Sequence, residues 1–300
     1  MGQQRGFKSN LLIVPEASFG VSPGNGTPVP IVSHTLKAKA NLVTPETITG
    51  RRDPSSPLDG YKAVEGQVVV PLELGSLAYW LTAMFGQTVT PWKLQDTVPS
   101  FQLVDNLPDI SKAVFYNGCK VKKVSFAFGG DAELKMTLDI VGAKETVQAS
   151  IGAPGAVAAL ERITQGNLVL TEGGVQTGVV TQMTLDIDFG VEDFAYPIGG
   201  GAIAATVLDG MVKIGGNVTA LLTNDDLWAK ARAATETSFE VSAVVGTKTL
   251  TIGLDEVRLD QPTKDLAGPK GRLIQFPFSA YFDDADPDNT AVQIGIAVGE

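Results

Sequence analysis

One segment of the chain occurs twice, 150 residues apart and without a gap. Residues 59–81 read DGYKAVEGQVVVPLELGSLAYWL, and residues 209–231 read DGMVKIGGNVTALLTNDDLWAKA. The copies share an Asp-Gly start, a second glycine, one valine and two leucines. Each has the pattern of a turn, a strand, a cap and a short helix. A period this long indicates a duplicated domain rather than a solenoid of short units.

Length and composition agree with two domains rich in β-structure. The chain has 300 residues, of which 33 are glycine and only 19% are charged, and this favours strands and turns over helical bundles. We expect a mainly β protein with two tandem homologous β-sandwich or barrel domains, each with one short flanking α-helix. The expected parts are an N-terminal strand and arm (1–30), a first domain (31–150), a linker (151–166), a second domain (167–284) and a C-terminal arm (285–300).

The helix in each copy supplies the predicted structural core. In the first copy Leu77, Trp80 and Leu81 lie on one apolar stripe. Leu227 takes the place of Leu77 in the second copy. Helices this short are not stable alone, so we expect these four residues to pack against a sheet.

The residues that catalysis and metal binding need are scarce. His34 is the one histidine and Cys119 the one cysteine, which excludes paired-histidine zinc sites and a disulfide framework. The three glycines at 199–201 lack the Lys-Ser/Thr of a phosphate loop. The acidic residues at 284–288 lack the glycine and the final glutamate of a calcium loop. We therefore predict no catalytic residue, no cofactor and no metal, and a protein that is not an enzyme.

Charge is distributed unequally along the chain, whose formal net charge is −10. Residues 1–150 hold 14 Lys and Arg against 13 Asp and Glu, whereas residues 151–300 hold 9 against 20. A protein that grips nucleic acid through its phosphates is basic, so this chain should repel DNA more than it holds it. No apolar run reaches the ~18 residues of a membrane span, and no membrane is expected as a partner.

Three polar segments are candidates for contacts between molecules. The loop at 44–60 is long for a compact domain, and Arg51, Arg52 and Asp53 within it can pair with a neighbour or remain solvated. The ends of the chain, 1–30 and 285–300, read as straps to another subunit, with frayed termini as the alternative.

The chain resembles the tail tube (major tail) proteins of long-tailed bacteriophages over most of its length. The resemblance is carried by the entry Pro15–Pro23, by the strand around Gly60 and Gly66 with the helix Leu77–Phe85 after it, and by the hairpin from Tyr116 to Gly142. It implies β-sandwich or barrel domains joined into stacked rings around a channel, and a virion protein made and assembled in the cytoplasm of the host bacterium. Many such subunits have one domain, and the duplication here resembles the two-domain type.

The resemblance also implies partners. The first is the chain itself, as homotrimeric pseudo-hexameric rings stacked into a tube, with first and second halves alternating. The others are the tape-measure, tail terminator and baseplate proteins, with transient non-specific passage of DNA through the channel. Asp139, Asp186 and Asp188 are the candidate lumen-facing residues of an acidic wall, and Arg51, Arg52 and Asp53 the candidate inter-ring loop.

Two other readings remain open at this stage. One is a duplicated β-sandwich adhesin or binding module, and the other is a different tail component, such as a terminator or baseplate hub. The strap hypothesis adds that removal of residues 1–9 and 289–300 should leave the domains folded and weaken stacking.

Overall fold

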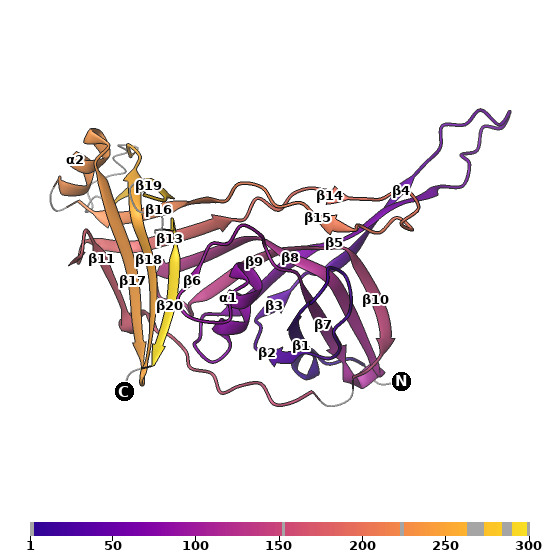
Figure 1. Cartoon of the computed structure of the whole chain (residues 1–300), viewed down its shortest axis with the longest axis horizontal. Coiled ribbons are helices and arrows are strands. Elements are labelled where there is room, and N and C mark those ends of the chain that lie inside the picture. Colours follow the sequence, from indigo (N-terminus) through magenta and orange to yellow (C-terminus); the bar gives the residue numbers. More distant parts are fainter. Residues whose placement is uncertain (1–2, 152–153, 223–224, 263–272, 284–289, 299–300) are drawn as a thin grey trace.

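The structure is a computed structural model that describes residues 3–151, 154–222, 225–262, 273–283 and 290–298. It is mainly β, as predicted, with large antiparallel sheets and two α-helices in the described residues. Figure 1 shows the first half of the chain, from β1 to β10, beside the second half, from β11 to β20. The stretch that joins them runs along one side of the molecule.

The first half contains ten strands and one α-helix. They are β1 (Asn10–Pro15), β2 (Thr27–Val29), β3 (Ser33–His34), β4 (Lys37–Val43), β5 (Leu58–Pro71), α1 (Leu77–Phe85), β6 (Trp92–Lys93), β7 (Phe101–Leu107), β8 (Lys112–Gly129), β9 (Lys135–Gly142) and β10 (Lys144–Ala149). β1 pairs with β2 and β7, β7 with β8, and β8 with both β10 and β9. β9 then pairs with β5, and β5 with β3 and β4.

The described part of the second half also contains ten strands and one α-helix. They are β11 (Leu168–Glu172), β12 (Val175–Gln176), β13 (Val180–Asp188), β14 (Phe194–Ala195), β15 (Thr206–Val207), β16 (Lys213–Leu221), α2 (Asp226–Ala233), β17 (Glu236–Val245), β18 (Lys248–Leu259), β19 (Leu273–Tyr281) and β20 (Gln293–Val298). β11 pairs with β12 and β17, β17 with β18, and β18 with both β20 and β19. β19 then pairs with β16, and β16 with β13.

A single row of strands crosses from one half to the other. β8 of the first half pairs with β13 of the second half along seven residues of each strand. The row therefore runs β4, β5, β9, β8, β13, β16, β19, β18 without a break. Side chains alternate across it, so that Val124 and Leu185 are fully buried on one face while Lys123 and Asp186 reach the other. This sheet has one apolar face and one wet face.

The two helices differ in how deeply they are buried. Leu77, Trp80 and Leu81 of α1 are at most 3% exposed, whereas Leu227 of α2 is only partly buried at the edge of the core. The buried carboxylate of Glu73 accepts hydrogen bonds from the backbone N–H groups just before α1, including that of Ser76 at 2.8 Å. Those donors would otherwise be unsatisfied at a helix start.

The segment predicted as a linker is attached to both halves over its second part. Ile163 is buried, and the backbone of Glu161 and Leu74 are hydrogen-bonded at 3.0 Å. The carboxylate of Glu161 forms an ion pair of 2.7 Å with Lys248 on β18. These contacts fix the path of the chain between the halves, where the composition alone indicates a flexible connection.

The expected C-terminal arm is part of the second half over most of its described length. Residues 293–298 form β20, which pairs with β18 and, through Gln293 and Ile294, with β6 of the first half. Ile294 is 1% exposed. Removal of this segment would therefore take a strand out of a sheet, so we now expect its deletion to affect the fold of the second half as well as contacts between subunits. Asp284, Asp286 and Asp288 lie outside the described residues.

Candidate assembly surfaces

The internal junction, which we define as the β8–β13 pairing with its flanking side chains, is held by a buried ion pair. Nζ of Lys120 lies 2.6 Å from Oδ1 of Asp209 and 3.0 Å from the carbonyl oxygen of Val207. The Lys120 side chain is 8% exposed and that of Asp209 is 20% exposed. Asp209 also accepts a hydrogen bond from the backbone N–H of Val98. One carboxylate of the second half thus satisfies two donors of the first half.

Apolar contacts complete this junction. The rings of Phe85 on α1 and Phe189 after β13 meet edge to face, with centroids 5.7 Å apart. Val191, two residues further on, is completely buried. An aromatic pair of this geometry stabilises by about 0.5–1.5 kcal/mol beyond the area that it buries. The two halves therefore share one core instead of touching through a solvated interface.

The candidate lumen-facing aspartates lie on the wet face of the continuous sheet, close to one lysine. In the strand register Asp139 on β9 and Asp188 on β13 both stand opposite Lys123 on β8. Nζ of Lys123 is 3.2 Å from Oδ2 of Asp186. Residues of one register share a face of a sheet, so the structure brings the three carboxylates together. It also places a lysine among them, so this face of the sheet carries mixed charge, whereas the aspartates alone predict an acidic face.

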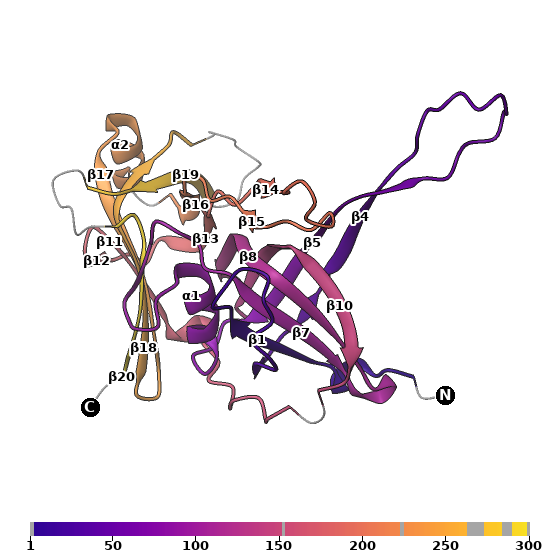
Figure 2. The same cartoon turned by 45° about the vertical axis from the view of Figure 1, so that its right-hand side comes forward.

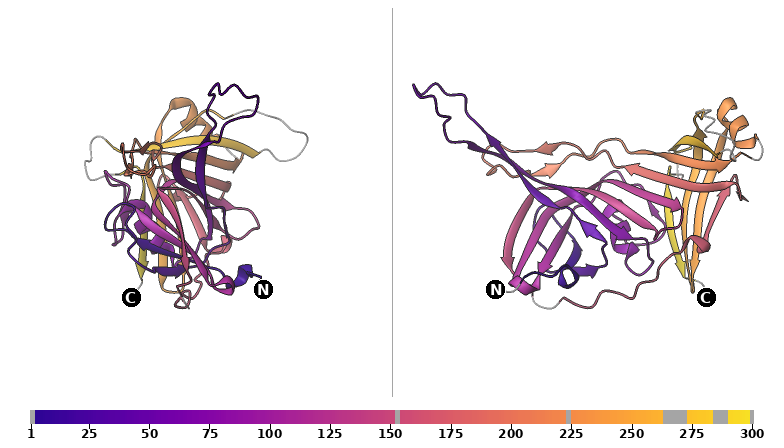
Figure 3. Two further views of the ribbon diagram at one scale, coloured as in Figure 1. Left: turned by 90° about the vertical axis from the view of Figure 1, so that its right-hand side faces the viewer. Right: turned by 180° about the vertical axis from the view of Figure 1, so that it is seen from behind.

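The long loop predicted between residues 44 and 60 extends a hairpin far beyond the body of the protein. Figure 2 and Figure 3 show β4 and β5 projecting as an arm, with the β14–β15 segment beside its base. Arg51 and Asp53 form a pair of 2.7 Å near its tip, and both side chains are at least 70% exposed. Ile48 is 98% exposed, so the arm also presents one large apolar side chain.

The base of the arm is braced by the second half of the chain. The rings of Tyr61 and Tyr196 stack with centroids 4.0 Å apart, and the Tyr196 hydroxyl donates a hydrogen bond to the carbonyl oxygen of Lys62. The backbone N–H of Lys62 donates to the carbonyl of Ala202. The loop at 190–208 therefore directs the arm away from the body.

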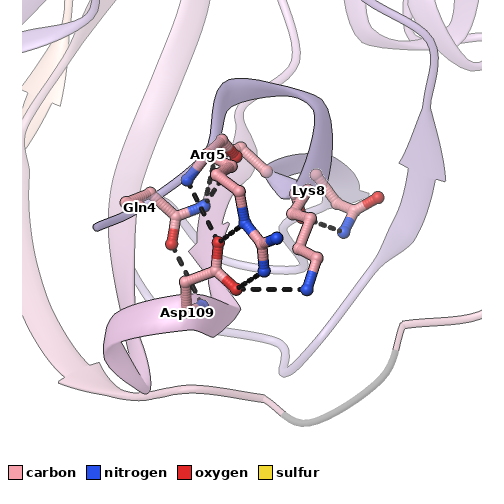
Figure 4. A network of polar contacts seen from close by, with 6 residues as sticks. Gln4, Arg5, Lys8 and Asp109 are labelled. Carbon is pink, nitrogen blue, oxygen red and sulfur yellow. Dashed lines mark hydrogen bonds and ion pairs between the residues drawn. The ribbon is translucent and has the colours of Figure 1, made fainter. Parts of the chain in front are cut away.

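The N-terminal residues are attached to their own half through one carboxylate. Figure 4 shows Gln4, Arg5 and Lys8 gathered around Asp109. Arg5 donates to both carboxylate oxygens at 3.0 Å, and Nζ of Lys8 is 3.3 Å away. These hydrogen bonds to Arg5, helped by Lys8, hold the pKa of Asp109 far below the ordinary value. Residues 4–8 are thus tied down in the single chain, whatever strap the preceding residues form.

The lone histidine and the lone cysteine are placed for packing. Nε2 of His34 lies 3.5 Å from a carboxylate oxygen of Asp105. Cys119 is buried on β8, opposite Phe101 of the paired strand β7. Burial raises the pKa of the Cys119 thiol well above its ordinary value, which keeps it protonated and unreactive. In the parts of the chain that the structure describes, no group of three or more His, Cys, Asp or Glu side chains is arranged to hold a metal ion.

The internal junction was missed by sequence reasoning. Lys120 and Asp209 are 89 residues apart, and neither lies in a pattern that distinguishes a buried charge from a solvated one. A signal did exist, because Asp209 is one of the residues that the repeat preserves as Asp-Gly.

Comparison with known proteins agrees with this geometry. No helix among the described residues is long and apolar enough to span a membrane. A search of curated proteins found no match to the chain. A family model described as phage tail tube protein matches residues 6–280, which is most of the sequence. The chain therefore belongs to the phage tail tube family, and it is a structural protein of the virion tail that assembles with itself into a tube and associates with other tail components.

Proposed function

We propose that three chains close into a ring with six similar positions, and that such rings stack into the tube through which DNA leaves the virion. The observation that carries this proposal is the matching order of strand pairings in the two halves. β1, β7, β8, β9, β5 and β4 follow one another as β11, β17, β18, β19, β16 and β13 do. The pairing of β10 with β8 has its counterpart in that of β20 with β18.

The correspondence extends to an irregularity in the ladders. The β7–β8 ladder shifts register between Phe101 and Leu103, and the β17–β18 ladder shifts between Thr237 and Phe239. Bulges are specific features of a fold, so their equivalent positions support two copies of one domain. Boundaries near 31–150 and 167–284 fit this division, with residues 290–298 added to the second copy.

Fused copies of one domain fit a ring in which first and second halves alternate. The internal junction is then one of two kinds of contact around the ring, and the contact between chains is the other. A head-to-tail contact that repeats by rotation closes into a ring. Three chains supply six halves, whereas six chains would supply twelve.

The wet face of the continuous sheet is the surface that we propose for the channel wall. Its mixture of Lys123 with Asp139, Asp186 and Asp188 leaves no basic stripe to hold phosphates. DNA would pass without being retained. The exposed arm, with Arg51, Arg52, Asp53 and Ile48, is then the contact between successive rings.

Assembly would take place in the cytoplasm of the host bacterium, with the tape-measure protein inside the tube and the terminator and baseplate proteins at its ends. Neither an adhesin nor a terminator or baseplate hub is favoured, because the family that matches is that of the tube itself.

The test is microscopy combined with mass measurement. The full chain is concentrated and imaged by cryo-electron microscopy, and the ring is weighed by native mass spectrometry. We expect tubes or stacked rings of three chains. Rings of six chains would refute the trimer and leave the tube, whereas a monomer at every concentration would refute self-assembly without other tail proteins.

A further inference from the structure

The strands at the two ends of the row, β4 and β18, have counterparts that meet inside the chain. β8 corresponds to β18, and β4 to β13, through the pairings described above. The internal junction joins β8 to β13, but in the single chain β18 and β4 are not joined. Lys120 and Asp209, the ion pair of the internal junction, therefore have counterparts near the end of β18 and beside β4.

The counterpart of Lys120 is Arg258. Gly66 stands opposite Ile140, and Ile140 opposite Val121. In the second half Gly216 stands opposite Phe278, and Phe278 opposite Leu259. Because Gly66 matches Gly216 in the repeat, the residues just before Val121 and Leu259 also match, and these are Lys120 and Arg258.

The counterpart of Asp209 is Asp59, which opens the first copy of the repeat. The surroundings agree, because a side chain added at Gly60 would meet the carbonyl oxygen of Asn41 and one added at Gly210 would meet that of Gly190. The residues after these carbonyls, Leu42 and Val191, correspond as well.

We propose that the contact between neighbouring chains repeats the ion pair of the internal junction, with Arg258 of one copy paired to Asp59 of the next. This inference rests on the ring proposed above and specifies which residues of two neighbouring chains meet in it. Arg258 is 55% exposed in the single chain, where its guanidinium lies 2.8 Å from Glu236. Lys120 at the matching position is buried, and the neighbouring chain would bury Arg258 in the same way.

An exposed leucine gives independent support. Val191 is completely buried in the internal junction, whereas Leu42 is 59% exposed. Leu42 stands opposite Asp59 in the β4–β5 ladder, so the two residues approach the neighbouring chain together. The described residues of the single chain leave most of Leu42 uncovered.

Charge is complementary across the proposed contact. Inside the chain, lysines of β8 face acids of the second half, as in the pair Lys123–Asp186. At the counterparts of this second pair the signs are exchanged, whereas Arg258 and Asp59 keep the signs of Lys120 and Asp209. Lys37 corresponds to Asp186, because it stands opposite Glu65 as Asp186 stands opposite Gly215. Asp260, directly after β18, takes the place of Lys123 within β8, because its backbone N–H bonds to Pro277 of β19 as Lys123 stands opposite Asp139 of β9.

The receiving surface is hollow and rich in carboxylates. A depression of about 510 Å³ is lined by Glu236, Glu256, Arg258, Asp260, Ser279, Tyr281, Phe282 and Asp283. Desolvation and the nearby carboxylates of Glu236 and Asp283 raise the pKa of Glu256. A basic edge carrying Lys37 and Lys39 would relieve this crowding of like charge.

The test reverses the charges of the proposed pair singly and together. R258D and D59R should each raise the critical concentration for assembly by about tenfold or more, because each places like charges in contact. The double variant R258D/D59R should return close to the wild-type value. R232D is the matched control, because Arg232 has the same exposure as Arg258 and lies 4.0 Å from its only described carboxylate partner.

Assembly is followed by sedimentation and negative-stain microscopy, and folding of dilute samples by circular dichroism. Single variants that assemble like the wild type would overturn the inference while leaving the ring standing. A folded double variant that still fails to assemble would also overturn it. Failure of the wild type to form rings would reject the proposed function first, and the inference with it.

Discussion

Removal of the carboxylate of Asp209 should destabilise the unassembled chain far more than a surface mutation does. The Lys120 side chain is 8% exposed in the wild type, and in D209A its ammonium would keep one described partner, the carbonyl of Val207 at 3.0 Å. The N–H of Val98 loses its acceptor as well. Breaking a buried ion pair by removing one partner costs about 3–5 kcal/mol, because the other charge is left uncompensated. We expect a loss of that size in the free energy of unfolding.

The double-mutant cycle isolates the cause. K120M/D209A removes both charges, so it should recover about half or more of the loss, because apolar replacements of buried pairs are often close to neutral. Urea denaturation is followed by circular dichroism at a concentration too low for assembly. D53A is the control, since its pair with Arg51 is solvent-exposed and should contribute less than about 1 kcal/mol. The reasoning would be refuted if the free energy of unfolding of D209A lay within about 1 kcal/mol of the wild-type value. It would also be refuted if K120M/D209A were no more stable than D209A.

Two further predictions concern the helix and the N-terminus. W80A should lower the free energy of unfolding by about 3–5 kcal/mol, because Trp80 is 1% exposed. The control Y79A, at a side chain that is 44% exposed, should cost less than about 1 kcal/mol. A thermal melt of W80A close to that of the wild type would contradict the packing of α1. Arg5 lowers the pKa of Asp109, so the attachment of residues 4–8 should be complete above the ordinary carboxyl pKa of about 3.9 and be lost as the pH falls further. Amide hydrogen exchange of residues 4–8 measures this attachment, with D109N as the pH-independent control. Equal protection of these amides at pH 5 and pH 2 would count against the prediction.

Much of the strand and helix pattern could be predicted because it depends on local periodicity. The apolar stripe from Leu77 to Phe85 predicts a helix, and α1 has these bounds. Trp80 is buried because a nine-residue helix is stable only against a sheet. In these cases the residues that decide the structure are neighbours in sequence.

The junction and the C-terminal strand could not be predicted in the same way. Burial of Lys120 depends on Asp209, which comes near it only after β8 and β13 have paired. Polar residues and glycine flank residues 293–298, so the sequence indicates an arm. In the structure these residues pair with β18 instead. Long-range pairing decides both, and no local pattern reports it.

The exchange of charge between the halves has a consequence for which rings can close. If two first halves met, Lys123 of β8 would face Lys37 and Lys39. If two second halves met, the carboxylates around Arg258 would face Asp186 and Asp188. Like charges in contact disfavour both arrangements. In the proposed ring, alternation of unlike halves pairs these signs, and two halves joined in one chain would make that alternation automatic. Each half would then always occupy the same kind of position, which would leave the two free to diverge in charge.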